Sequence, residues 1–352
     1  MIHVNIPPID SEEPQHSAGI RVGKDLLKAT KNFTEESPAT SWWYVISTFL
    51  FMMAALAVAG IVEFWPIRFI FSVLGGLLIV RSFITYHDYL HGSILHHSRI
   101  AFWLFYTFGA LVLTPPRSWL ESHNYHHGHV GQISTIVAGT FPVISTKMWK
   151  ESSRWQRLVY RIQRHPLVVL FSYPLVFLIN ITLIPLLKNP IKHFDSLISL
   201  IVHFGLITLL WLSGGFNLAF FVILLPMTIA STLGCYLFFA QHSFRRMQIV
   251  SPESWNYYRA ALESSSYMRM NRIMQWFTGN IGYHHIHHLN VRIPFYRLPE
   301  VMDKVPELQA PITTTLSPSD IINCFRSALW DEDKQRMVSY KEAREIEEDK
   351  YL

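Results

Sequence analysis

The sequence predicts an all-α, multi-pass membrane protein. Half of its 352 residues are hydrophobic and only 16% are charged, a smaller charged share than soluble domains carry. Long uncharged stretches alternate with short basic loops, which is the pattern of helices that cross a bilayer. We expect four transmembrane helices with re-entrant or interfacial segments among them, followed by a cytosolic helical cap. A count of six crossings is the alternative.

We expect the chain, residues 1–352, to form one domain with three regions. Residues 1–40 are polar and lack the apolar core and cleavage site of a signal peptide, so this segment is expected in the cytosol. Residues 41–240 form the membrane region, with residues 117–165 as an inserted cytosolic loop. Residues 241–352 are charged and form the cap.

The first two crossings are the clearest. Residues 37–62 carry no charge and are long enough to span as a helix, with Trp42 and Trp43 at the interface. Residues 69–86 return to the starting side, and Arg81 is expected to reach toward the headgroups.

The later apolar segments are harder to assign. Residues 100–116 and 166–187 have basic residues at both flanks, which favours re-entrant or interfacial segments over crossings. Residues 196–244 carry no formal charge and hold two spans, divided at residues 213–217. Six crossings would result if residues 100–116 formed a tight hairpin and a later segment split.

Composition excludes several classes of protein. Two cysteines, Cys235 and Cys324, are too few for a disulfide scaffold or a thiolate metal site. The net charge is +5, but the Lys and Arg residues do not form a basic stripe that alternates with the aromatic residues of a soluble sheet. No nucleic-acid partner is therefore expected. At the other end of the chain, residues 317–350 are expected to be helical, beginning at Ser317 or Ser319.

Histidine is the residue in excess, with 18 copies. Three clusters place imidazoles at i, i+3 or i+4, on one face of a helix and at the end of an apolar segment. A further histidine, His242, lies at the end of the last span. The histidines of the three clusters and this one make nine candidate ligands: His87, His91, His123, His126, His127, His242, His284, His287 and His288.

Nine imidazoles imply two metals, because one first-row metal takes about four to six ligands. Imidazole alone does not decide among iron, zinc, copper and nickel. Polar neighbours of these histidines are candidates to accept the second ring N–H and fix the tautomer. These neighbours are Asp88, Glu121, Asn124 and Asn280.

The remaining histidines are interpreted as structural. His285 lies on the wrong helical face, and His203 lies in an apolar span, where a packed, hydrogen-bonded role is expected. The others are expected on the surface or in loops: His96, His97, His129, His165 and His193.

The motifs HDYLH, HNYHH and GYHHIHH, with IPFYRLPE after the last, resemble the three histidine boxes of the membrane-bound fatty acid desaturases. Their order also agrees, and the stretch WFTGNIGYHHIHHLNVRIPFYRLPE is most similar to bacterial and cyanobacterial acyl-lipid desaturases. The resemblance covers residues 40–305.

This resemblance implies that the nine histidines ligate two irons, with His242 as the ligand that follows the last span. It implies an O2-dependent reaction that introduces a double bond into an acyl chain carried by a lipid or by coenzyme A. Some members have an asparagine one turn before that histidine, contacting a metal through water; here that position is Phe238. The bacterial inner membrane, with the active site on the cytosolic side, is the implied location.

No HPGG haem motif is present, so electrons are expected from a separate ferredoxin-, flavodoxin- or cytochrome-type donor. A basic run is a candidate docking surface for that donor or for lipid headgroups, although ordinary positive-inside charge explains it as well. It consists of Lys147, Lys150, Arg154, Arg157, Arg161 and Arg164. Aromatic residues are candidates for the walls of an acyl tunnel: Trp119, Trp149, Trp255, Trp276 and Phe277.

Two alternatives stay open at this point. Related histidine-box proteins hydroxylate fatty acids or alkanes or oxidise carotenoids to keto products, and the ligands do not separate these outcomes. A metal- or haem-binding membrane protein without oxidase activity is the other alternative. The IPFYRLPE tail favours desaturation.

Overall fold

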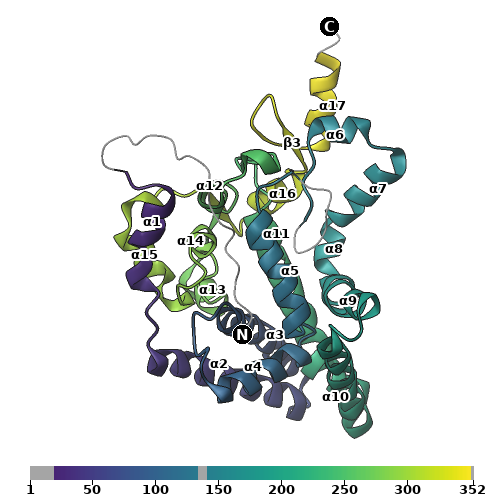
Figure 1. Cartoon of the computed structure of the whole chain (residues 1–352). Helices are drawn as coiled ribbons and strands as arrows, with labels where there is room; N and C mark the ends of the chain where they lie inside the picture. Colours follow the sequence, from purple (N-terminus) through teal and green to yellow (C-terminus); the bar gives the residue numbers. More distant parts are fainter. Residues whose placement is uncertain (1–19, 134–140, 350–352) are drawn as a thin grey trace.

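The computed structural model describes residues 20–133 and 141–349, most of which are helical. Figure 1 shows the apolar helices α2 (Pro38–Ile61), α3 (Trp65–His91) and α10 (Phe194–Ala219) toward one end of the molecule. The polar cap, with α16 (Pro318–Arg326) and α17 (Tyr340–Asp349), lies toward the other end. The histidine-bearing segments lie between these two parts.

Helices α2 and α3 pack against each other as an antiparallel hairpin. Ser37 caps α2 by accepting a hydrogen bond from the backbone N–H of Thr40, and Pro38 fills the first helical position. Helix α3 ends at Gly92, whose φ of 68° belongs to the left-handed region that favours glycine. This ending places His87 and His91 in the last turn and a half of α3, with both side chains buried.

The long apolar stretch Phe194–Gln241 contains α10 and α11 (Leu225–Gln241), joined by a π-helical segment, Phe220–Leu224. Backbone angles leave the helical region at Gly214 and Gly215. The break therefore falls inside the turn predicted at residues 213–217. With α2 and α3, this stretch gives three helices long and apolar enough to cross a membrane among the described residues.

Two other apolar segments do not form one long helix. Helix α4 (Arg99–Leu111) has 13 residues, about 20 Å at 1.5 Å per residue, against a hydrocarbon core of about 30 Å. Residues 166–188 are divided into α8 (Pro166–Leu170), the π-helical segment Tyr173–Leu183 and α9 (Ile184–Lys188). The π-helical segment has Pro174 near its start, where the missing proline N–H disturbs the regular hydrogen-bond ladder.

The other helices are short. They are α1 (Gly23–Ala29), α5 (Pro116–His129), α6 (Thr146–Glu151), α7 (Arg154–Gln163), α12 (Tyr257–Glu263), α13 (Arg272–Phe277), α14 (His284–Leu289) and α15 (Leu298–Lys304). Single 3₁₀ turns lie at Lys31–Phe33, Pro252–Ser254, Phe295–Arg297 and Pro306–Leu308.

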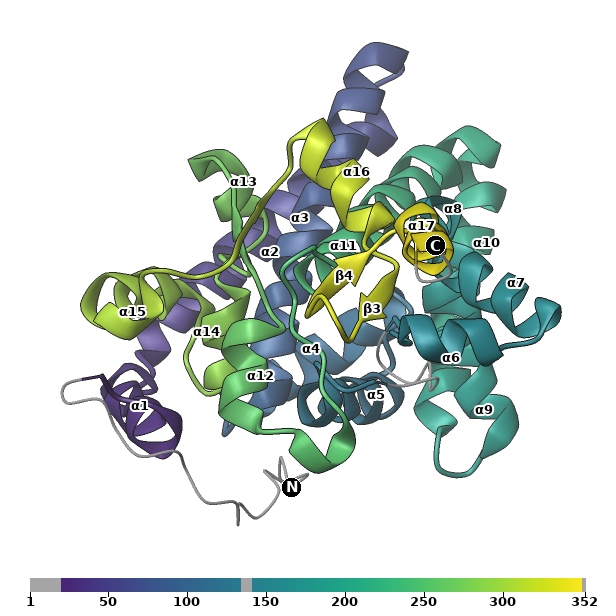
Figure 2. The same ribbon diagram turned by 90° about the horizontal axis from the view of Figure 1, so that it is seen from above.

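The expectation of an all-α chain was wrong in detail, because the cap contains four short strands. Strand β1 (Tyr267–Arg269) pairs in parallel with β2 (Thr313–Thr315). Strands β3 (Leu329–Asp331) and β4 (Arg336–Val338) form an antiparallel hairpin, which Figure 2 shows between α12 and α17.

This hairpin also corrects the single helix expected over residues 317–350. Ser317 does cap α16, accepting from the N–H of Asp320, but that helix ends at Arg326. Asp331 then turns the chain, because its Oδ1 accepts hydrogen bonds from the N–H groups of Asp333 and Lys334. The fully buried Trp330 anchors the hairpin in the cap.

Arg81 was expected to reach toward the headgroups, and in the structure its side chain is buried within the protein. It is 3% exposed, and its Nε donates to the hydroxyl of Thr48 on α2. One terminal N–H donates to the carbonyl of Trp276 on α13. Arg81 therefore ties α13 to the α2–α3 hairpin.

The close approach of α3 to α11 depends on Gly76. A Cβ there would lie 2.8 Å from the carbonyl oxygen of Pro226 and 2.8 Å from the Cβ of Ile229. We expect Gly76→Val to destabilise the protein by about 1–3 kcal/mol, the usual cost of overpacking a helix contact. Thermal unfolding in detergent measures this effect as a lower Tm.

Gly205→Ala is the matched control, because nothing lies within 4 Å of a Cβ at that position in α10. An equal loss of Tm in both variants would contradict the assigned contact.

Candidate metal centre

All nine predicted histidines are buried in the interior of the molecule. They come from the end of α3, from α5, from the residue after α11 and from α14. Their ring nitrogens form two groups, within each of which the closest nitrogens lie within 4.8 Å of one another. One group holds His87, His91, His123, His127 and His287; the other holds His126, His242, His284 and His288.

Helices α5 and α14 each contribute to both groups. On α5, His123 and His127 point to the five-histidine group and His126 to the four-histidine group. On α14 the assignment is reversed, because the i, i+4 pair His284 and His288 joins the four-histidine group. Residues four apart lie on one helical face and the third histidine is rotated away from them, so each HxxHH helix connects the two groups.

Within each group the Nε2 atoms face one another. In the five-histidine group, the Nε2 of His123 lies 3.0 Å from that of His87 and 3.1 Å from that of His127. In the four-histidine group, the Nε2 of His284 lies 2.8 Å from that of His242 and 3.1 Å from that of His288. Nitrogens that ligate one metal at about 2.1 Å and at about 90° to each other lie about 3.0 Å apart, so both groups fit a cation.

Several ring nitrogens in these groups have no hydrogen-bond partner among the described residues. They include both nitrogens of His91 and the Nδ1 atoms of His126, His127, His284 and His288. A buried polar atom without a partner costs free energy, and a set of facing imidazole lone pairs cannot be satisfied by N–H donors alone. A cation in each group would satisfy the facing Nε2 lone pairs.

Burial keeps these imidazoles neutral. Desolvation, with the repulsion of neighbouring imidazoles, holds the pKa values of His123, His126, His127, His284, His287 and His288 well below 6.5. Burial also lowers the pKa of His242 to about 4. Neutral imidazole is the form that binds metals, so the residues suit that role at physiological pH.

Two contacts fix ring orientation. The Nδ1–H of His87 donates to Asp88 Oδ1 at 3.1 Å, and the other oxygen of Asp88 accepts from the backbone N–H of Phe295 at 2.7 Å. The Nδ1–H of His242 donates to the carbonyl of Ser264 at 2.9 Å, which leaves Nε2 facing the group. Phe295 and Ser264 act through their backbones, so no side-chain signal in the sequence identifies them.

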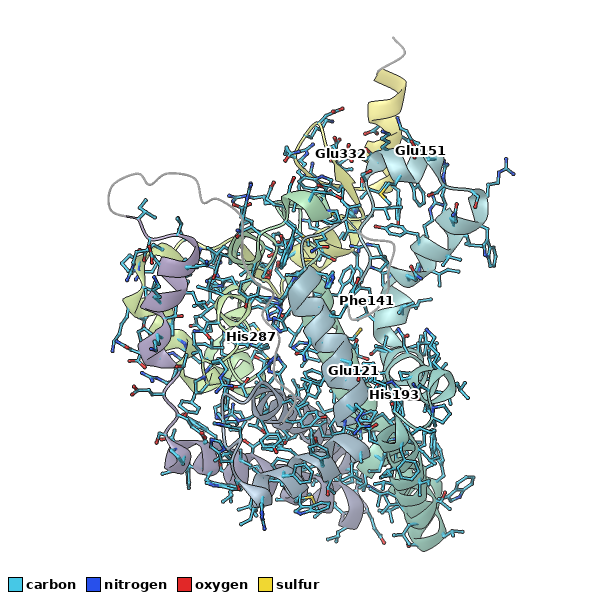
Figure 3. The ribbon with its side chains drawn as sticks, viewed as in Figure 1. Glu121, Phe141, Glu151, His193, His287 and Glu332 are labelled. Atoms are coloured by element: carbon cyan, nitrogen blue, oxygen red, sulfur yellow. The ribbon has the colours of Figure 1, made fainter. Side chains whose placement is uncertain are left out.

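The other predicted neighbours lie elsewhere. Glu121 is exposed and forms an ion pair with Lys192 at 2.9 Å. Figure 3 shows Glu121 beside His193, whereas His287 lies in the interior. Asn280 donates to the carbonyl of Phe295 and so supports Asp88 indirectly. The Oδ1 of Asn124 is buried and has no partner among the described residues.

The histidines interpreted as structural lie outside both groups. The Nε2–H of His285 donates to the carbonyl of Leu308 at 3.3 Å, and the Nδ1–H of His203 donates to that of Leu111 at 2.6 Å. His96 and His97 are exposed. His193 lies in the turn before α10, as expected, but its side chain is buried and its Nε2 lies 3.8 Å from a carboxylate oxygen of Glu121.

A mostly apolar cavity of about 270 Å³ reaches the metal centre at His87, His123 and His284. Its walls come mainly from α3, α5, the π-helical segment Tyr173–Leu183 and α11. They include Phe83, Trp119, Phe141, Val176, Met227 and Ala230. We call it the acyl cavity. Of the five aromatic residues proposed as tunnel walls, Trp119 lines it and stacks on His123, with ring centroids 4.3 Å apart.

Phe238 lies at the same place. Its ring is 4.6 Å from that of His126 and forms part of the cavity wall. An apolar ring therefore lies against the four-histidine group at this position.

Comparisons with known proteins agree with this geometry. The family model described as "Fatty acid desaturase" matches residues 63–316. The chain belongs to the fatty acid desaturase family. A "Fatty acid desaturase" of Bacillus subtilis (strain 168) is 29% identical over 92% of each chain. An "sn-1 acyl-lipid omega-3 desaturase (ferredoxin)" of Nostoc sp. (strain 36) is 23% identical over 85% of this chain and 84% of its own.

Membership confirms that the protein is an oxidoreductase that acts on fatty acyl chains. Each of the two buried histidine groups could hold a metal ion, in keeping with this assignment. In the plant Vigna radiata var. radiata, an "Omega-3 fatty acid desaturase, endoplasmic reticulum" is 26% identical over 77% of this chain and 73% of its own.

The depressed histidine pKa values predict how the metal-free desaturase responds to pH. An unfolded histidine takes up its proton near pH 6.5, whereas the buried histidines do so only at lower pH. The unfolded state therefore binds more protons below pH 6.5, and the stability present above that pH is lost as the pH falls. We expect the Tm of chelator-treated protein to fall between pH 7 and pH 5.

Below pH 6.5 the free energy of unfolding should fall with falling pH. Replacing His126 by Gln should reduce the slope of this free energy against pH by at most about 1.4 kcal/mol per pH unit, which is the contribution of one proton. His97→Ala, at an exposed position, should leave it unchanged. A pH-independent Tm of the metal-free protein would show that the imidazoles are not held neutral by the fold.

Proposed function

We propose that the nine histidines hold two iron ions and that the protein is an O2-dependent acyl-chain desaturase. The observation that carries this proposal is the meeting of two adjacent, buried histidine groups with one apolar cavity. Family membership supports iron as the metal, since imidazole donors alone suit several metals.

The bound irons would supply the oxidising power that unactivated C–H bonds require, since no acid or base among protein side chains can remove hydrogen from an unactivated methylene group. The overall reaction takes two hydrogens from adjacent methylenes and, with two electrons and two protons from outside, reduces O2 to two waters. The carbon–carbon single bond becomes a double bond. The protein chain provides position, dryness and electron access.

The acyl cavity provides position and dryness. Its wall reaches His87, His123 and His284, so a chain lying in it would bring methylene groups beside both histidine groups. The ring of Trp119 lies against His123 and that of Phe238 against His126, and both keep water from the reacting carbons. The substrate is a fatty acyl chain carried by a lipid or by coenzyme A.

Electrons come from a separate protein of the ferredoxin, flavodoxin or cytochrome type. The printed name of the Nostoc relative includes ferredoxin, which supports the first of these. Three of the basic residues considered for docking serve internal contacts. Arg164 is buried among backbone carbonyls, Arg157 donates to the carbonyls of Trp149 and Lys150, and Arg161 stacks on Trp149. A docking surface would therefore use the other three residues of the run, Lys147, Lys150 and Arg154, all exposed.

We further propose four crossings of a bacterial inner membrane, with the metal centre on the cytosolic side. Helices α2 and α3 supply two, and the stretch Phe194–Gln241 supplies two because it breaks at Gly214 and Gly215. At 1.5 Å per residue this stretch of 48 residues would measure about 72 Å if straight, more than twice a hydrocarbon core. An even number of crossings brings His87 and His242 to the same side.

Lipid analysis of a host with a simple fatty acid profile tests the proposal. We expect new unsaturated acyl chains with the wild-type protein and none with His126→Ala, because this change opens the four-histidine group. Iron content of the purified variant should fall from two equivalents toward one. His97→Ala, an exposed histidine, is the matched control and should retain both.

Hydroxylated or keto products from the wild-type protein would favour a related histidine-box oxygenase. Two equivalents of iron with no O2-dependent product would favour a metal-binding protein that is not an oxidase.

The cavity wall predicts a second effect. Ala230 of α11 is buried in the wall, whereas Thr228 lies exposed on another face of the same helix. We expect Ala230→Phe to shorten the acyl cavity and to lower the ratio of long-chain to short-chain products at least about tenfold, the lower end of the discrimination that one methylene gives in an apolar pocket. Product chain lengths measure this ratio. Thr228→Phe should leave it unchanged, and an equal shift in both variants would contradict the assigned wall.

A further inference from the structure

A second cavity, of about 370 Å³, lies between α2, α3 and α13 and shares no lining residue with the acyl cavity. Its wall includes Tyr44, Arg81, Arg272, Gln275 and Tyr283. Two arginines line it and no carboxylate does, among the residues that the structure describes. The excess of positive charge indicates an anionic ligand.

Arg81 is the buried centre of this cavity. The contacts of its guanidinium are neutral: the hydroxyl of Thr48, the carbonyl of Trp276 and the face of the Trp276 ring, 4.2 Å away. Within residues 20–133 and 141–349 no carboxylate forms an ion pair with it, although the side chain is only 3% exposed. A buried cation without a counter-charge is costly, and a bound anion would remove that cost.

Other donors surround Arg81. Both amide atoms of Gln275 are buried and make no hydrogen bond to any described residue. Arg272 lies exposed on the same helix, α13, and also lines the cavity. Two guanidinium groups and an amide N–H match a group with several acceptor oxygens. Phosphate is the anion that arginine binds through parallel hydrogen bonds.

The surroundings of the cavity identify the source of such a phosphate. On α13, the side chain of Ile273 is 68% exposed and that of Trp276 is 40% exposed. On α2, Trp43 is 70% exposed, and Tyr44 beside it lines the cavity. Exposed aromatic and aliphatic side chains at the end of a membrane-type helix are typical of the headgroup region of a bilayer. Lipid phosphates lie at that depth.

We propose that this cavity binds the phosphate group of a membrane phospholipid, with Arg81 as the buried contact and Arg272 at the mouth. Basic pockets beside membrane helices recognise lipid headgroups in the same way. The ligand is distinct from the acyl chain that is oxidised, because the two cavities are separate. The proposal does not depend on the metals or on the reaction.

Binding to the full-length protein in detergent tests it, with three probes: dioleoyl phosphatidylglycerol, dioleoylglycerol, which lacks the phosphate, and inorganic phosphate. Native mass spectrometry counts retained lipid, and thermal unfolding gives an apparent Kd. We expect phosphatidylglycerol to raise the Tm and dioleoylglycerol not to do so. Arg81→Gln and Arg272→Gln should each weaken binding about tenfold, which corresponds to the loss of one charge-assisted hydrogen bond.

Arg99→Gln is the matched control, since Arg99 is an exposed cation at the start of α4 and outside the cavity. If Arg81→Gln does not fold, Arg272→Gln and Gln275→Leu carry the test, because Arg272 is exposed and the side-chain amide of Gln275 makes no hydrogen bond to any described residue that its loss would break. Equal weakening by Arg99→Gln, or equal binding of dioleoylglycerol, would overturn the proposal. Inorganic phosphate binding as tightly as the lipid would overturn the assignment to a lipid.

Discussion

The structure depends on the mutual approach of nine neutral imidazoles whose lone pairs point at each other. Nitrogens only 2.8–3.3 Å apart, without enough N–H donors to pair them, are unfavourable in a water-poor interior unless cations lie among them. The same burial that lowers their pKa values keeps protons from replacing the metal. Burial of the imidazoles therefore both favours a metal among them and keeps them free of protons. The fold buries them by enclosing the histidines between the membrane helices and the cap.

The sequence predicted the parts of this centre that obey helical periodicity. Spacings of three and four residues place imidazoles on one face, and the two groups in the structure use these spacings on α5 and α14. Glu121 does not follow this pattern: it lies two residues before His123, so on α5 it is rotated from that histidine by about 200°, and it pairs with Lys192. Nearness in sequence is not nearness in space on a helix. Asp88 contacts His87 because the backbone N–H of Phe295 holds its second oxygen.

Long-range contacts explain what the sequence did not predict. The burial of Arg81 was not predicted, because its partners Thr48 and Trp276 lie 33 and 195 residues away in the chain. The β3–β4 hairpin interrupts a charged, helix-favouring stretch because Trp330 and Met337 are buried against Phe244 and Met247. Tertiary burial there outweighs local propensity. Long apolar segments, in contrast, were predicted well, because composition alone defines them.

Helix α3 is the common wall of the two cavities. Its residues Phe83 and His87 face the acyl cavity, whereas Arg81 faces the polar one. A chain of hydrogen bonds also runs from the polar cavity to the metal centre: Asn280 donates to the carbonyl of Phe295, whose N–H donates to Asp88, which accepts from His87. Any ligand that orders Asn280 would therefore also hold the Phe295 backbone that fixes His87. In this arrangement the apolar cavity would receive the chain to be oxidised, and a ligand in the polar cavity would stabilise the backbone that orients His87.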